Sequence, residues 1–315
     1  MNNIAKLTVS PSSEAFQDYI KRDHPEAVKI KPASHWADEL AYSLENPPHQ
    51  QGDCMPWDKT YSTIRMRPSE LSVWAGTNGH GKSSLNCQVL IWLAAQGKRV
   101  MIASMEMPPL KTLNRMVRQA AGGASPDRKW QDMFFKRMEG NLWFYDQLGS
   151  VDATRCLDVV RYSADRLKCD HIQVDSITKI KGMMGDHSNG LQMDFVNDLQ
   201  SLAFDYKTHI HLVSHVRKGN DERNAPGKFD LKGSGGIADQ ADNIYIVWQN
   251  KDKLNNPNDP AFDGKPDTVL KCVKQRHGEW EGPVMLWFGA KGAMQFVGRE
   301  GERLTCPGFS IGDRP

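Results

Sequence analysis

The stretch WAGTNGHGKSSL, residues 74–85, constrains the fold of this chain more than any other part of its sequence. It matches the pattern G-x-x-x-x-G-K-[ST] from Gly76 to Ser83, between an apolar run typical of a buried strand and a run typical of a helix. Glycines at these positions let backbone N–H groups turn inward around phosphate oxygens, beside the positive end of the following helix. The stretch therefore predicts a strand, a phosphate-binding turn and a helix.

Two side chains of this stretch have roles that backbone groups cannot fill. Lys82 is expected to reach the β- and γ-phosphates as a point charge, and the Ser83 hydroxyl is expected to ligate Mg²⁺. A glycine-rich turn with a solvated lysine is the alternative, but the flanking strand and helix favour a nucleotide site. The sequence therefore predicts ATP and Mg²⁺ as cofactors. The residues expected to bind the nucleotide are Gly76, Thr77, Asn78, Gly79, His80, Gly81, Lys82, Ser83 and Ser84.

The chain from residue 66 onward alternates short apolar runs with longer amphipathic ones. This pattern is typical of an α/β fold with a doubly wound, mostly parallel sheet that helices cover on both faces. Strands are expected at 71–76, 98–105, 142–146, 171–175, 209–214 and 243–249. Helices are expected at 82–97, 108–123, 152–168 and 192–207. Loops are expected at 217–230 and 250–267, which are rich in polar residues, Gly and Pro.

Acidic residues lie at the carboxyl ends of two of the expected strands, where ligands of such sheets gather. Asp175 ends the strand 171–175 and could hold Mg²⁺ through its water shell, with a turn aspartate as the alternative. His171 and Gln173 make this strand imperfectly apolar. Glu106 follows the strand 98–105 and could polarise the attacking water, but a glutamate that starts a helix is equally compatible with this position. The residues alone leave both alternatives open.

Composition excludes several classes of protein. The 315 residues are 39% hydrophobic and 25% charged, as in an ordinary globular chain that can bury a full α/β core. The first residues lack the basic start and apolar core of a secretion signal, and no apolar run reaches the roughly 18 residues of a membrane span. The six cysteines form no C-x-x-C pair, which favours free thiols over zinc ligands. We expect a cytoplasmic protein with no membrane partner.

The organisation of the chain is expected to be one large domain with two small appendages. Residues 1–65 are rich in Pro, His and polar residues and predict an N-terminal arm with one amphipathic helix at about 34–45. In that helix Trp36, Leu40 and Leu44 recur behind Ser34, a candidate N-cap. The arm either packs on its own core or docks on a neighbouring subunit. Residues 66–300 form the α/β domain, and 301–315 form a C-terminal tail.

Segments in a fixed order give this sequence a family resemblance. They are GTNGHGKSS, ASMEMP, IQVDS, HLVSHVRKG with DLKGSGGIADQADN, and KQRHGEWEG. Together they resemble the RecA-like helicase domain of DnaB-type replicative helicases, a group that includes bacteriophage primase–helicases and the mitochondrial Twinkle enzyme. The similarity covers residues from about 53 to 298, and SMEMP and DLKGSGGIADQAD are its most specific parts.

The resemblance implies a catalytic role for residues that the pattern alone does not assign. It implies Glu106 as the base that activates water and Asp175 as the Mg²⁺ ligand. His215 would sense the γ-phosphate at a strand end where many relatives carry Gln. Arg276, with Lys274 beside it, would reach the ATP of the next subunit as an arginine finger. Without the resemblance, His215 reads as a core or loop histidine and Arg276 as a surface arginine.

Nucleic-acid contact is expected in the loop after residue 216. A Gly/Ser-rich turn lets backbone amides approach phosphates, and cations add attraction that does not depend on base sequence. The candidate residues are Arg217, Lys218, Arg223, Lys228, Lys232, Gly233, Ser234 and Gly235. The formal net charge is only +2, so a near-neutral subunit would depend on local patches or on several subunits pooling their charge. A solvated loop is the alternative.

The resemblance implies a ring-forming, ATP-dependent replicative DNA helicase of phage type that translocates on single-stranded DNA. We expect a homo-oligomer, with a hexamer favoured. No primase domain fits within residues 1–65, so the primase, and any loader, are expected to be separate proteins. The alternative is a RecA-like DNA-dependent ATPase or motor for recombination, partition or packaging that unwinds nothing. A P-loop kinase is a third reading, which an arginine finger does not favour.

Overall fold

The computed structural model describes residues 30–46, 51–185, 188–216 and 235–309. The chain divides into two compact units, Met1–Pro48 and His49–Pro315. Each unit is described separately.

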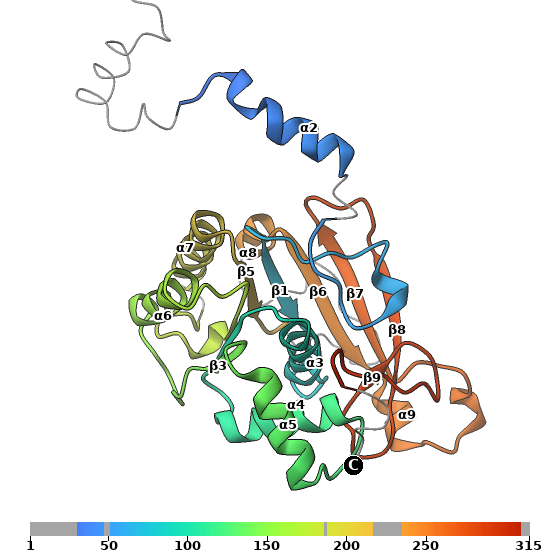
Figure 1. The fold of residues 1–315 in the computed structure, drawn as a ribbon. Helices are drawn as coiled ribbons and strands as arrows, with labels where there is room; N and C mark the ends of the chain where they lie inside the picture. Colours follow the sequence, from blue (N-terminus) through green and yellow to red (C-terminus); the bar gives the residue numbers. More distant parts are fainter. Residues whose placement is uncertain (1–29, 47–50, 186–187, 217–234, 310–315) are drawn as a thin grey trace, which may run out of the picture. The chain divides into compact units, whose positions relative to one another are not determined.

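The larger unit is built on a nine-stranded sheet, within the described residues, in the order β3-β2-β4-β5-β1-β6-β7-β8-β9 (Figure 1). The strands from β3 to β6 in this order pair in parallel, and β7, β8 and β9 continue the sheet antiparallel. Their bounds are β1 Leu71–Ala75, β2 Val100–Ser104, β3 Leu142–Phe144, β4 His171–Asp175, β5 His209–Val213, β6 Asn243–Gln249, β7 Thr268–Gln275, β8 Gly282–Phe288 and β9 Phe296–Val297.

The mostly parallel sheet and all the strands expected from the sequence are confirmed. The antiparallel strands β7 to β9 were not anticipated. Along β7, buried residues alternate with half-exposed ones, and Lys271 and Lys274 take outward positions. Such a strand at the margin of a sheet buries one face only, so it lacks the continuous apolar run of β1 or β5.

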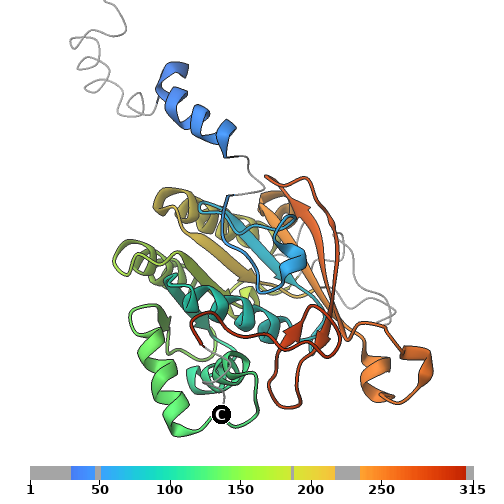
Figure 2. The same cartoon turned by 45° about the vertical axis from the view of Figure 1, so that its right-hand side comes forward.

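Helices cover both faces of the sheet (Figure 2). Their bounds are α3 Lys82–Ala95, α4 Pro109–Ala121, α5 Arg128–Met138, α6 Ala153–Asp165, α7 Asn189–Tyr206, α8 Gly235–Gln240 and α9 Lys251–Asn255. Helices α3, α4 and α5 share one hydrophobic cluster, and α6, α7 and α8 share the cluster on the other face. The expected helices correspond to α3, α4, α6 and α7.

The short helices α5, α8 and α9 were not expected from the sequence. Helix α9 lies in 250–267, where a loop was expected; it begins because the Asn250 side chain accepts a hydrogen bond from Lys253 N at 3.0 Å. Helix α5 is capped in the same way by Asp127, which accepts from Trp130 N at 2.8 Å. Local caps of this kind start a helix even where its apolar pattern is short.

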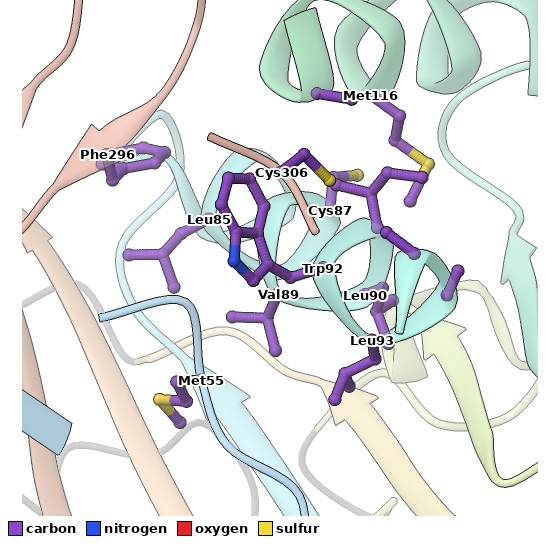
Figure 3. Close-up of a cluster of buried hydrophobic side chains, with 14 of the residues drawn as sticks. Met55, Leu85, Cys87, Val89, Leu90, Trp92, Leu93, Met116, Phe296 and Cys306 are labelled. Atoms are coloured by element: carbon purple, nitrogen blue, oxygen red, sulfur yellow. The ribbon is translucent and has the colours of Figure 1, made fainter. Parts of the chain in front are cut away.

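Helix α3, which follows the P-loop, is buried on almost every side. Figure 3 shows its side chains surrounded by Met55 from the segment before β1, Met116 from α4, and Cys306 from the C-terminal segment. This enclosure explains why α3 is apolar all round rather than amphipathic. A helix fixed in this way holds the preceding turn in a defined position.

Segments expected to be appendages belong to the larger unit. Trp57 is 1% exposed, and its Nε1 donates a hydrogen bond to Phe296 O at 2.8 Å. Cys306 and Phe309 are buried, so residues 301–309 pack on the core. The boundary between the two units lies at Pro48, earlier than the residue 65 expected from the sequence. Residues 53–66 belong to the larger unit because their apolar side chains pack with those of α3.

The smaller unit contains the 3₁₀ helix η3, Ala33–Trp36, followed by α2, Ala37–Glu45. The expected helix at about 34–45 is present, but Ser34 is not its N-cap. The chain enters through a 3₁₀ turn in which His35 N donates to Pro32 O at 2.9 Å, which places Ser34 inside η3. Trp36, Leu40 and Leu44 are 50%, 59% and 75% exposed.

Two findings concern the whole of the described chain. All six cysteines are free, and five of them are buried. In the ranges that the structure describes, no helix combines the length and the apolar character that crossing a membrane requires.

Candidate nucleotide-binding site

The site begins with the turn between β1 and α3. A Cβ atom on Gly76 would lie 2.4 Å from Val247 O of the neighbouring strand β6, so only glycine fits there. Gly81 is the N-cap of α3 and has φ 82°, a left-handed conformation that favours glycine. These two constraints produce a tight turn whose N–H groups precede a buried helix. The expected strand, turn and helix are confirmed.

Lys82 is folded over this turn. Its Nζ donates hydrogen bonds to Gly76 O at 2.7 Å and Thr77 O at 3.0 Å. Burial lowers the pKa of Lys82 to about 8, although the charges of Asp175 and Glu106 oppose this effect. A cation in this position can exchange two loop carbonyls for phosphate oxygens and keep its charge paired.

The parallel register brings the expected catalytic residues to one edge of the sheet. Ser104 pairs with Asp175 across β2 and β4, and Asp175 pairs with Val213 across β4 and β5. Because β2, β4, β5 and β1 are consecutive neighbours in the sheet, their carboxyl ends carry Glu106, Asp175, His215 and the P-loop side by side.

A cleft of about 1230 Å³ opens at this edge. Its lining includes most of the expected nucleotide-binding turn together with Glu106, Asp175 and His215. Two expected positions of the turn do not line it. Gly76 lies beneath the turn against β6, and His80 is buried there, where its Nδ1 accepts a hydrogen bond from Gln249 N at 3.1 Å. The lining residues of the turn are Thr77, Asn78, Gly79, Gly81, Lys82, Ser83 and Ser84.

Asp175 is suited to a divalent cation. Its side chain is 3% exposed, and burial raises its pKa to about 6, while the hydrogen bond with Ser83 opposes the rise. Its Oδ1 has no hydrogen-bond partner among the described residues. A buried carboxylate oxygen beside the Ser83 hydroxyl fits Mg²⁺, which proteins usually hold through one or two side chains plus phosphates and water.

Glu106 is held as an ionised carboxylate. Its Oε1 accepts hydrogen bonds from Ser176 Oγ at 2.6 Å and Thr178 Oγ1 at 3.3 Å, and lies 3.6 Å from His215 Nε2. The His215 contact, ahead of the Ser176 hydrogen bond, lowers the pKa of Glu106 to about 2 against the opposing effect of burial. The other ring nitrogen of His215, Nδ1, is buried without a hydrogen-bond partner in the described part of the chain.

Some lining residues were missed by the sequence analysis. Arg115 of α4 reaches the cleft, and its Nε and Nη1 have no hydrogen-bond partner within the described residues. Thr178 and Lys179 come from η6, Ile177–Lys179, directly after β4. Helical spacing could have indicated Arg115, because it lies three residues after Thr112 and four before Gln119 on the buried side of α4.

Arg276 and Lys274 are not among the residues that line this cleft. Arg276 follows β7, and its N donates to Asp242 O at 2.8 Å; Asp242 N in turn donates to Leu71 O at 2.9 Å, at the start of β1. The P-loop follows the other end of β1, which is about 15 Å away for a strand of this length at roughly 3.3 Å per residue. Arg276 therefore lies at the opposite edge of the sheet from the cleft of its own subunit.

The expected DNA-contacting positions are nearly all outside the described residues. This holds for Arg217, Lys218, Arg223, Lys228, Lys232, Gly233 and Ser234. Gly235 is described and is the first residue of α8. Val216, the last described residue before that interval, lies beside the P-loop, where its N donates to Gly76 O at 3.4 Å.

Fold and site together define a P-loop ATPase domain of the RecA-like class. The sequence matches the family of the DnaB-like helicase C-terminal domain over residues 58–297, and the chain belongs to this family. The family expected from the sequence motifs is therefore confirmed.

Three known proteins illustrate the relationship. The chain is 24% identical over 210 residues to a DNA helicase/primase of Enterobacteria phage T3; the match covers 60% of this chain and 37% of that protein. The solved structure of another protein's ATPase domain has a TM-score of 0.70 at 16% identity, covering 85% of this chain and 99% of that one. A DnaB-like replicative helicase, in a structure concerned with its interactions with primase, has a TM-score of 0.66 at 16% identity over 89% and 73% of the two chains.

Proposed function

We propose that this protein is a ring-forming, ATP-dependent replicative DNA helicase that translocates on single-stranded DNA. The observation that carries the proposal is the convergence of Lys82, Asp175, Glu106 and His215 on one cleft, in a chain of the DnaB-like helicase family. An arrangement of cation, Mg²⁺ ligand and water-binding carboxylate at adjacent strand ends is what phosphoryl transfer from a nucleoside triphosphate requires.

Each group of the cleft has its own role in hydrolysis. The amides of the turn and Lys82 would bind the phosphates. Ser83 and Asp175 would hold Mg²⁺, which would supply charge neutralisation on the phosphate oxygens. Glu106 accepts a hydrogen bond from the attacking water and fixes its direction. With a pKa of about 2, this carboxylate orients and polarises the water rather than storing its proton.

His215 is suited to relay the state of the nucleotide. Its Nε2 faces Glu106, and it lies two residues before the segment 217–234, which we propose contacts DNA. Loss of the γ-phosphate would change the hydrogen bonds that Glu106 and His215 make, and the shift would pass directly into that segment. The predicted contacts are to phosphates, so translocation would not depend on base sequence.

Assembly into a ring, favoured as a hexamer, would supply what one subunit lacks. Arg276 lies at the sheet edge opposite the cleft of its own subunit, which supports action on the ATP of a neighbour, with Lys274 beside it. The exposed apolar side of α2 supports docking of the arm on an adjacent subunit. We propose that the primase, and any loader, are separate proteins, and that the protein works in the cytoplasm.

Three measurements test this function together. ATP hydrolysis is expected to rise with single-stranded DNA, forked duplexes are expected to be unwound, and negative-stain images with an ATP analogue and oligo-dT are expected to show rings. Lys82→Ala serves as the inactive control. Hydrolysis that single-stranded DNA does not stimulate would indicate a kinase-like activity. DNA-stimulated hydrolysis without unwinding would indicate a RecA-like motor for recombination, partition or packaging.

A further inference from the structure

Asp242 is a buried carboxylate that joins the start of β1 to the end of β7. It lies directly before β6, and Arg276 lies directly after β7, so the antiparallel pair Asn243↔Gln275 places them opposite each other. The Asp242 side chain is 4% exposed. A carboxylate with so little exposure is stable only where its oxygens have donors.

Each oxygen of Asp242 has a close donor, and Gln200 Nε2 lies farther off, 3.4 Å from Oδ1 and 3.5 Å from Oδ2. Leu71 N donates to Oδ2 at 2.8 Å, and Arg276 Nη1 lies 3.0 Å from Oδ1. The backbone adds two more links, from Asp242 N to Leu71 O and from Arg276 N to Asp242 O. The carboxylate therefore cannot turn without breaking its bond to β1, and it holds the guanidinium group against a rigid part of the sheet.

The other side of the guanidinium group is fixed by α8. Arg276 Nη2 donates to Asp239 O at 3.0 Å and to Gln240 O at 3.2 Å. Lys274 Nζ donates to Ala238 O at 2.8 Å and to Asp239 O at 2.9 Å. Both cations thus bind the last carbonyls of this helix, where a positive charge is favourable. With these contacts in place, the Arg276 side chain is still 39% exposed.

We propose that Asp242 is the positioning residue for Arg276, fixing the guanidinium group in the orientation in which it meets the neighbouring subunit's ATP. This inference rests on the proposed shared site. A long, flexible arginine side chain loses much conformational freedom when it binds a phosphate, and holding it beforehand removes that cost from the transition state. Asp242 is not among the described residues that line the nucleotide cleft of its own subunit, and its effect on catalysis passes through the subunit next to it.

Asp242→Asn tests this role because an amide cannot replace the carboxylate. One end of the amide accepts and the other donates, so either Leu71 N or Arg276 Nη1 faces a second donor. We expect kcat to fall roughly ten- to a hundredfold, the range for partners that orient a functional group, with KM for ATP unchanged. Asp158→Asn, which breaks the exposed 2.9 Å ion pair with Arg161 on α6, is the matched control and is expected to retain wild-type turnover.

Mixed rings distinguish positioning from a structural role. Lys82→Ala subunits cannot hydrolyse ATP but carry an intact Asp242 and Arg276. If Asp242 acts across the interface, mixing Asp242→Asn with Lys82→Ala subunits restores turnover, because an intact P-loop then faces a well-held arginine. A defect confined to the variant's own cleft would not be rescued, and this result would overturn the inference.

A second mixed-ring experiment distinguishes a failure of this inference from a failure of the proposed function. Arg276→Ala with Lys82→Ala is expected to regain activity on the same grounds. If this pair regains activity and the Asp242→Asn pair does not, Asp242 has no positioning role but the shared site remains. If neither pair regains activity, the shared site itself is rejected. Thermal unfolding is measured first, and if Asp242→Asn does not fold, Asp242→Glu, which keeps both acceptors but displaces the guanidinium group, enters the same mixing assay with the same expected rescue.

Discussion

At the scale of single residues, the cleft contains two carboxylates whose surroundings shift their pKa values in opposite directions. Asp175 is buried with one oxygen lacking a hydrogen-bond partner in the described residues, and its pKa is raised to about 6. Glu106 lies at the rim, where it accepts from Ser176 Oγ and lies 3.6 Å from His215 Nε2, and its pKa is lowered to about 2. Asp175 therefore has an oxygen to which the proposed Mg²⁺ could bind, whereas Glu106 is ionised at any physiological pH.

Glu106→Gln should separate nucleotide binding from hydrolysis. The amide oxygen can still accept from Ser176, so the cleft should keep its shape, but the charge that polarises water is lost. We expect turnover to fall roughly 10²- to 10⁴-fold, the range for such catalytic groups, while affinity for a fluorescent ATP analogue stays within about threefold. Steady-state hydrolysis and equilibrium binding measure the two quantities. Turnover near that of the wild type would remove Glu106 from the catalytic residues.

At the scale of secondary-structure elements, hydrogen bonds join β1, β5 and β4 beneath α3. Trp74 Nε1 donates to His211 Nδ1 at 3.1 Å, and His211 Nε2 lies 3.1 Å from His171 Nδ1. His171 Nε2 is 3.0 Å from Asp53, which also pairs with Lys98 at 2.9 Å. Because an indole N–H can only donate, Nδ1 of His211 must be unprotonated. His171 of β4 thus serves this network rather than weakening the strand.

Stability should therefore fall in mild acid. Burial, ahead of the nearby His171, lowers the pKa of His209 to about 3, and burial lowers that of His211 well below its usual value. The unfolded chain binds protons at these histidines below about pH 6.5 and the folded chain does not, so the free energy of unfolding decreases as the pH falls below this value. For His209 the loss at pH 5 is roughly 2 kcal/mol.

Urea unfolding at pH 7.5 and at pH 5 measures this effect. His211→Gln keeps one acceptor for Trp74 and one donor for His171 but does not titrate. The difference in free energy of unfolding between the variant and the wild type should therefore be smaller at pH 5 than at pH 7.5. His35→Gln, in the exposed η3, is the matched control and should show the wild-type pH dependence. An unchanged pH dependence in His211→Gln would contradict the assignment of neutral buried histidines.

Helix α2 carries a further expectation at this scale. Leu40 and Leu44 share one side of the helix, whereas Tyr42 lies on the other. If the arm docks on a neighbour, each leucine contributes roughly 1.5–3 kcal/mol to assembly. Leu40→Asp with Leu44→Asp should then weaken assembly at least about a hundredfold by analytical ultracentrifugation. Tyr42→Asp is the control; an equal effect from both variants would mean that charge, not a docking face, governs assembly.

The sequence predicted those elements whose pattern is local and continuous. The parallel strands are buried on both faces, so β1 and β5 are recognisable without their neighbours. Strand β7 is not recognisable in this way, because buried and half-exposed residues alternate along it and no continuous apolar run marks it. The P-loop, Glu106 and Asp175 lie at the ends of predicted strands, and the structure brings them to one cleft. Arg115 and Asp242 were missed. Helical spacing places Arg115 on the buried side of α4 but does not say what it faces there. Asp242 is recognised only through Leu71 and Arg276, which are distant in the sequence.

At the scale of the whole molecule, the proposed binding to DNA would depend on how subunits combine their charge. With a net charge of +2, a single chain has little attraction for a polyanion. A ring would bring the segment 217–234 of every subunit to one channel, and Lys218 and Lys232 of that segment are candidates for phosphate contacts. Contacts of this kind release counterions and therefore depend steeply on salt.

Lys218→Ala with Lys232→Ala should weaken single-stranded DNA binding about equally on every sequence, because phosphates carry no sequence information. The slope of log affinity against log salt should flatten by roughly 0.7 for each phosphate contact that is lost. Basal hydrolysis should persist, since neither lysine is assigned to the nucleotide cleft, while its stimulation by DNA should fall. Lys168→Ala, at an exposed ion pair after α6, is the control and should leave the salt slope unchanged. If the double variant keeps its affinity and its slope, this segment does not contact DNA, and the protein is left as a RecA-like ATPase whose partner must be sought elsewhere.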